Sequence, residues 1–518
     1  MASEITKVSV VDSRILQSKP KFAVEKGPLS LTNVPYRSIT ASQSQMTFNI
    51  IVPSESVFID RAVDWQTTVY ASVDVTVTGA TTTTNTPILV YGRDVALAPF
   101  PLHELCATMS ATINDTTTVI NTNDVKNTLL RLTDYKRHRK TRTCPSMLDK
   151  HYKYPNPPNT ASNILGAKAN NSPLSAFGNE MAVDEKPNGS WGDFQWTDAA
   201  GAYSANTTVA VAGVTGAAGS YQLINGQPCT TGNDIVTTVY RLYFRFKSTE
   251  RLLISPFIFA DDNEVSTGLF GIQNIQLLMN FQNPAGAGRL LRVAQAGSGF
   301  LAGAGGTSWG VVSNCQFQNV NSGSCFANPV VNVQYLTPSL DVPLPAKNII
   351  PYMDYPRFIS QQNVGSVAAT VFGANVAAAP VGQSVQSQTI TLNAIPDLLA
   401  IYVKPNSYTT TVSGSTPDPT QGDWVLPITG ISVNFDNYAG LLSSHSQEQL
   451  YRMCVRNGLE MDFDQWRGYA QDGSAGVSGG TNILPLSGGP LLLKPGRDIV
   501  LQAGQAPSLN FGGCIAVC

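Results

Sequence analysis

The same succession of a strand, an Asn/Asp turn, a polar cap and a short amphipathic helix occurs twice in this chain of 518 residues. The first copy covers residues 109–132, with its turn at Asn114-Asp115. The second copy covers residues 431–457, with its turn at Asp436-Asn437. A chain of this length accommodates two domains of roughly 200–250 residues each. The repeated succession therefore predicts two related β-domains in one polypeptide.

Alternating apolar and polar residues predict strands that are buried on one face. Met46, Phe48, Ile50 and Val52 alternate with mostly polar residues, and residues 69–77 place Val or Ala at every second position. Successive side chains of a strand point to opposite faces, so such segments bury one face and leave the other in water. We expect an all-β fold.

The first of the two helices is predicted mainly from its apolar spacing. Val125, Leu129 and Leu132 fall on one face of a helix that starts near residue 122. The side chain of Thr122 or Asn123 is expected to cap its first turn, because a side-chain oxygen there accepts a free backbone N–H.

The second helix has stronger end signals. Ser446 and Gln449 have the spacing of a capping box, and Gly458 supplies a C-terminal stop. The predicted apolar stripe of this helix is Leu450, Met453 and Cys454.

A second internal likeness sets the expected domain plan. Residues 48–59 resemble residues 242–253 at an offset of 194, whereas the helices are offset by about 322, so the repeat is one of topology with different insertions. We predict a boundary near residues 240–255. The expected plan is an N-terminal arm (1–28), a first domain (29–247, with a long insertion at about 155–234) and a second domain (248–518, with insertions at about 283–325 and 362–420).

Composition favours a protein whose surface is covered by partners. Only 13% of the residues are charged, against about 25% in ordinary soluble domains. Burial in an assembly would explain this, although secreted β-proteins are also poor in charge. The net charge of −2 excludes a global attraction to nucleic acid or membranes.

Targeting and cysteine patterns point to the cytosol. No run approaches 18 apolar residues, so no transmembrane helix is expected. The first ten residues lack an apolar signal core. The eight cysteines are scattered, and we expect free thiols, with a bridge between Cys315 and Cys325 as the alternative.

Patterns that could carry catalysis or ligand binding are weak. The four histidines have no metal-ligand spacing, and the segments 261–264 and 297–302 are interpreted as a polar turn and a Gly-rich loop instead of calcium and dinucleotide sites. Glu460, Asp462 and Asp464 alternate on a predicted strand and could serve a glycosidase, but a solvated strand face is the favoured interpretation. We expect no catalytic residue, metal or cofactor.

One basic cluster stands out in this charge-poor chain. It is interpreted as a contact surface toward a neighbouring subunit or toward packaged nucleic acid. Arg131 belongs to it, Lys150 and Lys153 extend it, and tyrosines interleave with it. The core of the cluster, called the basic run below, is Lys136, Arg137, Arg139, Lys140 and Arg142.

The chain resembles the double jelly-roll major capsid proteins, most closely those of polinton-like viruses and virophages. The resemblance rests on residues 431–468, above all Gly440-Leu-Leu-Ser-Ser444, Gln449-Leu-Tyr-Arg-Met453 and Asn457-Gly458, with Trp466 following. Residues 57–61 and 268–272 give lesser support.

This resemblance implies a fold of two consecutive eight-stranded jelly rolls with one short helix in each and long loop insertions. It also implies a non-enzymatic major capsid protein whose homotrimers are pseudo-hexameric capsomers of an icosahedral DNA-virus shell. The implied partners are further copies of the chain, penton and minor capsid proteins and, weakly, packaged DNA. The implied location is the virion capsid, assembled in the host cytoplasm or nucleus. The alternatives are a single jelly-roll capsid protein with a projecting domain, and a β-sandwich adhesin or carbohydrate-binding protein.

Overall fold

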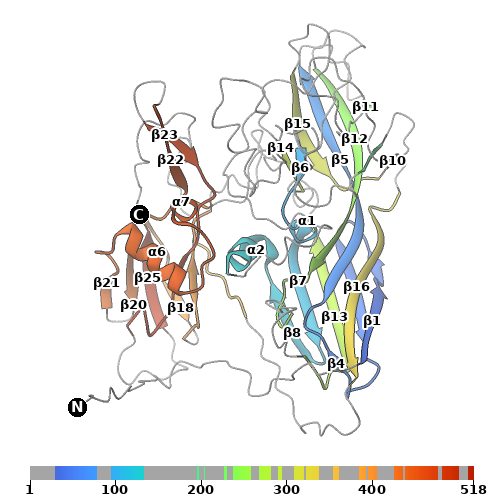
Figure 1. Cartoon of the computed structure of the whole chain (residues 1–518), viewed down its shortest axis with the longest axis horizontal. Helices are drawn as coiled ribbons and strands as arrows, with labels where there is room; N and C mark the ends of the chain where they lie inside the picture. Colours follow the sequence, from blue (N-terminus) through green and yellow to red (C-terminus); the bar gives the residue numbers. More distant parts are fainter. Residues whose placement is uncertain are drawn as a thin grey trace, which may run out of the picture.

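The structure is a computed structural model of the whole chain. It describes residues 30–78, 95–132, 195–197, 203–204, 227–229, 237–257, 268–281, 290–293, 309–319, 323–337, 354–360, 384–392, 395–404, 425–435, 438–475, 481–500 and 511–517. The described strands form two groups, called the first β-unit (residues 30–337) and the second β-unit (residues 384–517), which stand side by side with a helix between them (Figure 1).

One face of the first β-unit is a nine-stranded antiparallel sheet. Its centre is β5 (Asp64–Thr78) paired along its whole length with β12 (Thr237–Arg251). The strand order is β1, β16, β5, β12, β9 and β10, and β4, β11 and β15 pair with β16, β12 and β5. The remaining bounds are β1 Ser30–Arg37, β4 Phe58–Ile59, β9 Gln195–Thr197, β10 Tyr203–Ser204, β11 Gln227–Cys229, β15 Trp309–Gln316 and β16 Phe326–Thr337.

The other face of the first β-unit is a five-stranded antiparallel sheet in the order β2, β3, β13, β7 and β8. Its bounds are β2 Thr40–Ala41, β3 Gln45–Ile51, β13 Asn274–Phe281, β7 Cys106–Ile113 and β8 Thr116–Ile120. A separate two-stranded ladder pairs β6 (Val95–Leu97) with β14 (Leu291–Val293).

The core of the first β-unit lies between these two sheets. Met46, Phe48 and Ile50 from β3 are almost fully buried, and Val69 and Val73 of β5 belong to the same cluster. The predicted burial of the alternate apolar residues is therefore confirmed over residues 46–52 and 69–73. Burial of each such side chain contributes roughly 1.5–3 kcal/mol relative to leaving it in water.

The second β-unit has a smaller described sheet in the order β17, β25, β20 and β21, with β18 also on β25. Two short ladders, β19 with β24 and β22 with β23, accompany it. The bounds are β17 Val385–Gln386, β18 Ile390–Leu392, β19 Leu399–Ile401, β20 Ile431–Phe435, β21 Tyr438–Leu441, β22 Tyr469–Ala475, β23 Thr481–Pro485, β24 Leu491–Leu493 and β25 Phe511–Val517.

Four helices are described, two in each β-unit, so the expectation of one helix in each is wrong. They are α1 (Pro101–Leu105), α2 (Thr122–Arg131), α6 (Gln447–Arg456) and α7 (Phe463–Arg467). The predicted capping box of Ser446 and Gln449 is present at α6, and Leu450, Met453 and Cys454 are buried. At α2 the N-cap is Asn121 without a side-chain bond, so the predicted cap by Thr122 or Asn123 is wrong.

The predicted repeat corresponds to two equivalent elements. Strands β7 and β8 form a hairpin that leads into α2, and β20 and β21 form a hairpin that leads into α6. Asn114 makes the first turn with a φ of 49°, a left-handed conformation that Asn tolerates better than most residues. Its side-chain Oδ1 also accepts a hydrogen bond from the Gln273 N–H at 2.8 Å.

The predicted boundary near residue 247 is not where the strand pairing divides the chain. Strands β13, β15 and β16 lie beyond residue 247, yet all three pair with strands of the first β-unit. The likeness of residues 48–59 to residues 242–253 joins β3 and β12, which belong to opposite sheets of one unit. It therefore does not mark two domains. The reason is that many antiparallel neighbours in these sheets, such as β1 and β16, are distant in sequence, and local patterns do not show which strands pair.

The expected insertions contain sheet strands. Strand β15 lies within 283–325, β9, β10 and β11 lie within 155–234, and β17, β18 and β19 lie within 362–420. The arm (1–28), the basic run, and the segments 261–264 and 297–302 lie outside the described residues.

Candidate functional site

The functional feature that the described structure shows best is the junction between the two β-units, with α2 at its centre. Figure 1 shows α2 between the two groups of strands. The helix follows β8 directly, and Leu129 and Leu130 are buried in the core of the first β-unit with Val125 packed against it. Leu132, one residue past the helix, packs instead against the core of the second β-unit. The prediction that Leu132 shares one apolar face with Val125 and Leu129 is therefore wrong.

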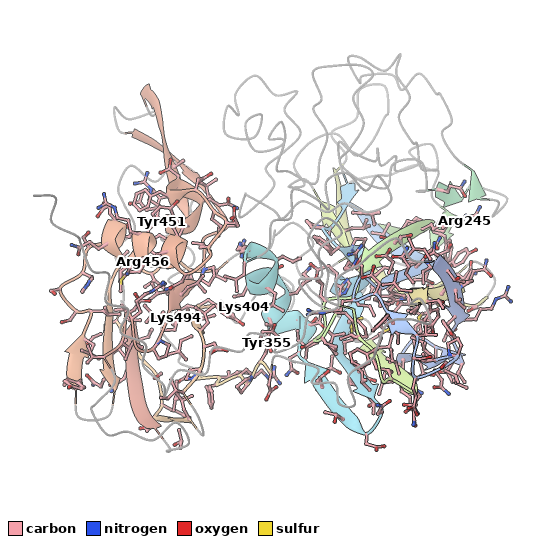
Figure 2. The ribbon with its side chains drawn as sticks, turned by 60° about the horizontal axis from the view of Figure 1, so that its bottom comes forward. Arg245, Tyr355, Lys404, Tyr451, Arg456 and Lys494 are labelled. Carbon is pink, nitrogen blue, oxygen red and sulfur yellow. The ribbon has the colours of Figure 1, made fainter. Side chains whose placement is uncertain are left out.

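The N-terminal end of α2 is held by the second β-unit and by the linker of residues 354–360. The Tyr402 hydroxyl donates to the backbone oxygen of Asp124 at 2.5 Å, and the Lys404 Nζ donates to the backbone oxygen of Asn123 at 2.8 Å. The Asp124 carboxylate forms an ion pair with Arg357 of the linker. A carboxylate in the first turn of a helix also interacts favourably with the helix dipole. Figure 2 shows Lys404 and Tyr355 beside α2.

The tyrosines at this junction remain hydrogen-bond donors at neutral pH. Burial raises the pKa of Tyr402 to about 12, and the nearby Asp124 carboxylate acts in the same direction. Burial likewise raises the pKa of Tyr355 to about 12. Both phenols are therefore neutral over the whole physiological range.

The C-terminal end of α2 is held through Arg131, which is only 1% exposed. Its backbone oxygen accepts a hydrogen bond from the Glu460 N–H at 2.9 Å, and its Nη2 donates to the Ser487 Oγ at 3.2 Å. Gln465 of α7 also reaches the Ser487 Oγ, at 3.4 Å. Arg131 was predicted to belong to the basic contact surface. Its hydrogen bonds to Glu460 and Ser487 instead join the two β-units within the chain.

Beneath α2, a buried polar network fixes the helix to the first β-unit. Lys126 of α2 forms an ion pair with Glu104 of α1, and both side chains are almost fully buried. The neighbouring His103 Nδ1 donates to the Glu250 Oε2 at 2.6 Å, and its Nε2 accepts a hydrogen bond from the Leu253 N–H at 3.2 Å. Buried charges of this kind need partners, because breaking such a pair costs several kcal/mol. His103 therefore has the structural role that was expected for it.

The carboxylates singled out in the sequence have structural partners. Asp462 is the N-cap of α7, and its Oδ1 accepts a hydrogen bond from the Gln465 N–H at 2.7 Å. Asp464 forms an ion pair with Arg467 at 2.8 Å on the exposed side of α7. The predicted strand over residues 460–466 is wrong, because the cap at Asp462 starts a helical turn there.

Four of the cysteines are free thiols. Cys106, Cys315, Cys325 and Cys454 are buried and unbridged, which excludes the alternative bridge between Cys315 and Cys325. Burial raises the pKa of Cys454 to about 12, so this thiol is protonated and unreactive at neutral pH.

The described residues offer neither a candidate metal site nor a candidate membrane-spanning helix. They contain no group of three or more His, Cys, Asp or Glu side chains placed to hold a metal ion. No described helix is long and apolar enough to cross a membrane.

The residues that sequence reasoning missed are those that bind α2 from the second β-unit. Tyr402, Lys404 and Ser487 are far from α2 in sequence and belong to no motif. The sequence held one signal. The apolar surface of the helix is wider than a single narrow stripe, because it includes Val125, Leu129, Leu130 and Leu132. A helix with a wider apolar surface than one stripe can bury two sides.

The chain is similar to virophage capsid proteins along almost its whole length. A family model described as "Sputnik virophage major capsid protein 1st domain" matches residues 3–335, and one described as "Major capsid protein V20 C-terminal domain" matches residues 355–512. The putative capsid protein V20 of Sputnik virophage is 25% identical over 515 residues, covering 97% of this chain and 72% of the relative.

Two solved structures are also similar. The cryo-EM structure of the Sputnik virophage matches with a TM-score of 0.66 and 21% identity, covering 99% of this chain and 86% of that chain. The crystal structure of the mavirus major capsid protein matches with a TM-score of 0.48 and 12% identity, covering 100% and 89%. The match to the first family model ends at residue 335, close to the end of β16 at Thr337. The match to the second begins at residue 355, at the start of the linker. The predicted all-β double jelly-roll class is confirmed, and a single jelly roll with a projecting domain is excluded.

Proposed function

This chain belongs to the family of Sputnik-type virophage major capsid proteins, and from that premise we propose that three copies of it form a pseudo-hexameric capsomer of an icosahedral shell. It is a structural component of the virion capsid that assembles with itself. The observation that carries the trimer proposal is the junction at α2. The second β-unit bonds to both ends of that helix, so each chain contributes two β-units in a fixed arrangement. Three such chains around an axis give a six-fold outline.

The capsomer is proposed to act through surfaces that fit neighbouring subunits, and not through catalysis. Asp462 and Asp464, the strongest carboxylate candidates in the sequence, are engaged as a helix cap and an ion pair. We infer that the chain has no enzymatic activity and needs no cofactor. A charge-poor surface on a free monomer would favour association, and a chain with 13% charged residues is consistent with burial between subunits.

Further contacts are part of this proposal. The basic run (Lys136, Arg137, Arg139, Lys140 and Arg142) and the arm (1–28) are proposed to contact neighbouring capsomers, penton or minor capsid proteins, with only a weak contact to packaged DNA. The net charge of −2 gives no general attraction to DNA, which ranks protein partners first. Assembly is proposed to take place in the host cytoplasm or nucleus.

The trimer is tested by light scattering coupled to size-exclusion chromatography. Three chains of 55.3 kDa give an expected mass of about 166 kDa. A stable monomer at micromolar concentration would overturn the capsomer proposal, and electron microscopy of the same fractions shows whether trimers go on to form shells.

A further inference from the structure

The outer face of the five-stranded sheet differs sharply in charge from the outer face of the nine-stranded sheet. The strands β2, β3, β13, β7 and β8 contain no Asp, Glu, Lys, Arg or His at any position. On the nine-stranded sheet, by contrast, the outward positions of β12 include Arg245, Lys247 and Arg251, and Asp64 lies beside Arg251 on β5. Figure 2 shows Arg245 on the side of the first β-unit that is turned away from the second. The two faces of one sandwich are therefore built for different surroundings.

The uncharged outer face is continuous across the sheet. Strand register places Thr40, Thr47, Leu278, Ser110 and Val119 in one row that crosses all five strands. The adjacent row is Asn49, Gln276, Thr112 and Thr117. These side chains alternate with the buried residues of the same strands, so they point away from the core.

Several polar groups on this face hydrogen-bond to one another across the strands. The Oγ1 atoms of Thr40 and Thr47 are 2.7 Å apart, and those of Thr112 and Thr117 are 2.8 Å apart. The Asn280 Nδ2 donates to the Thr108 Oγ1 at 2.9 Å. Because these groups satisfy one another, covering the face with a partner sacrifices few hydrogen bonds to water.

The face also exposes large apolar side chains. Ile51 is 67% exposed and Val119 is 52% exposed in the single chain. With strands spaced about 4.8 Å apart and rising about 3.4 Å per residue, the sheet offers a face of roughly 500–600 Å². A standard protein interface buries about 800 Å² per partner, so this face would supply more than half of one.

We propose that this uncharged face of the five-stranded sheet, defined by β2, β3, β13, β7 and β8, is covered by a second copy of the chain in the capsomer. Interface cores are depleted in charge, and a charged partner surface would bury its charges here without counter-charges. The chain itself is charge-poor and assembles with itself, so another copy is the partner that fits. The inference deepens the proposed capsomer and rests on it.

A matched pair of substitutions tests the face. Gln276 on β13 and Gln66 on β5 both point outward from the middle of their sheets, and neither is flanked across the strands by a charged residue. Gln276→Lys is expected to raise the concentration at which half of the chains are associated by about tenfold or more. Gln66→Lys is expected to change it less than about twofold, and Gln276→Met is expected to preserve association because it adds no charge.

Light scattering across a concentration series gives these midpoints, and it separates the two proposals. If the wild type associates while Gln276→Lys and Gln66→Lys behave alike, the face assignment is wrong and the capsomer stands. If the wild type is a monomer at every concentration, both the capsomer proposal and the face assignment are wrong.

Hydroxyl-radical footprinting of the wild type gives an answer even if Gln276→Lys fails to fold. Oxidation of Ile51 and Val119 is expected to fall at least threefold on going from dissociated chains to assembled capsomers. Equal oxidation in both states would overturn the assignment.

Discussion

At the scale of single residues, Asp462 shows how a carboxylate in this chain serves local structure. Its Oδ1 accepts the Gln465 N–H at 2.7 Å and so satisfies a free donor in the first turn of α7. This turn carries Trp466, which is 2% exposed and donates through its Nε1 to the Pro490 backbone oxygen at 2.9 Å. The cap therefore supports a buried anchor of the second β-unit.

Substitution of Asp462 is predicted to affect stability according to whether the new side chain keeps an acceptor. Asp462→Ala should lower the free energy of unfolding of the second β-unit by about 1 kcal/mol, whereas Asp462→Asn should cost only a few tenths. Asp464→Asn should cost under about 0.5 kcal/mol, because its ion pair with Arg467 is largely exposed. Urea denaturation measures all three.

The same variants test the absence of catalysis. The Asp462→Asn, Asp464→Asn double variant should assemble as the wild type does. If the wild type hydrolyses a glycan and the double variant does not, Asp462 and Asp464 take part in catalysis and the proposed purely structural role is wrong.

Residue-level prediction from the sequence succeeded where the signal was local. The capping box at Ser446 and the burial of Leu450 follow from contacts within one helix and its sheet, and both are confirmed. The prediction of a strand over residues 460–466 is wrong because carboxylates at alternate positions are also typical of a strand. The spacing of Asp462 and Gln465 indicates a helix N-cap instead, but this signal covers only one turn.

At the scale of elements, α2 is part of the first β-unit and also packs against the second. Leu129 packs into the first core, and Leu132 packs against the second, although they are three residues apart. Polar contacts at both ends of the helix, from Tyr402 to Asp124 and from Arg131 to Ser487, join it to the second unit. The helix thus fixes the spacing of the two β-units within one chain.

Truncation of these two leucines is predicted to weaken different parts of the molecule. Leu129→Ala should destabilise the first β-unit by roughly 2–5 kcal/mol, as expected for a fully buried leucine. Leu132→Ala, at a partly buried position, should cost less, about 1–2 kcal/mol, and its effect should appear in the second β-unit. Hydrogen exchange resolved by segment distinguishes them.

Leu450→Ala is the reference for this experiment, because Leu450 is fully buried in the second core. Faster exchange is expected in β7 and β8 for Leu129→Ala, and in α6 and β24 for Leu450→Ala. If Leu132→Ala instead accelerates exchange only in the first β-unit, α2 does not have the shared role assigned to it.

At the scale of the whole molecule, the number of β-domains was predictable and their boundary was not. The repeated hairpin and helix mark equivalent elements at β7–β8–α2 and β20–β21–α6, because each is continuous in sequence. The boundary depends on pairings such as β1 with β16, which joins Ser30 to Thr337. Residues 248–337 have the same strand patterns as the rest, so nothing in them shows which unit they complete.

The arm belongs to this scale, because an arm lacking apolar periodicity of its own gains order only from a partner surface. The family model that matches from residue 3 includes most of it, which makes the arm a part of the family's first domain. Deleting residues 2–28 is therefore predicted to leave folded trimers of slightly lower mass but to impair shell formation. Replacing the same residues with a Gly/Ser segment of equal length is the control that separates sequence-specific contacts from length.

Light scattering reports the trimers and electron microscopy reports closed shells. We propose that the arm and the basic run lie at the base of the capsomer, because five Lys/Arg within seven residues are costly to bury in a trimer interface without partners. The charge-poor insertions are expected to form loops at the opposite, outer end. Both arm variants should fail to close shells at concentrations where the wild type succeeds. Normal closed shells from the truncated chain, with the basic run on the outer surface, would contradict this placement.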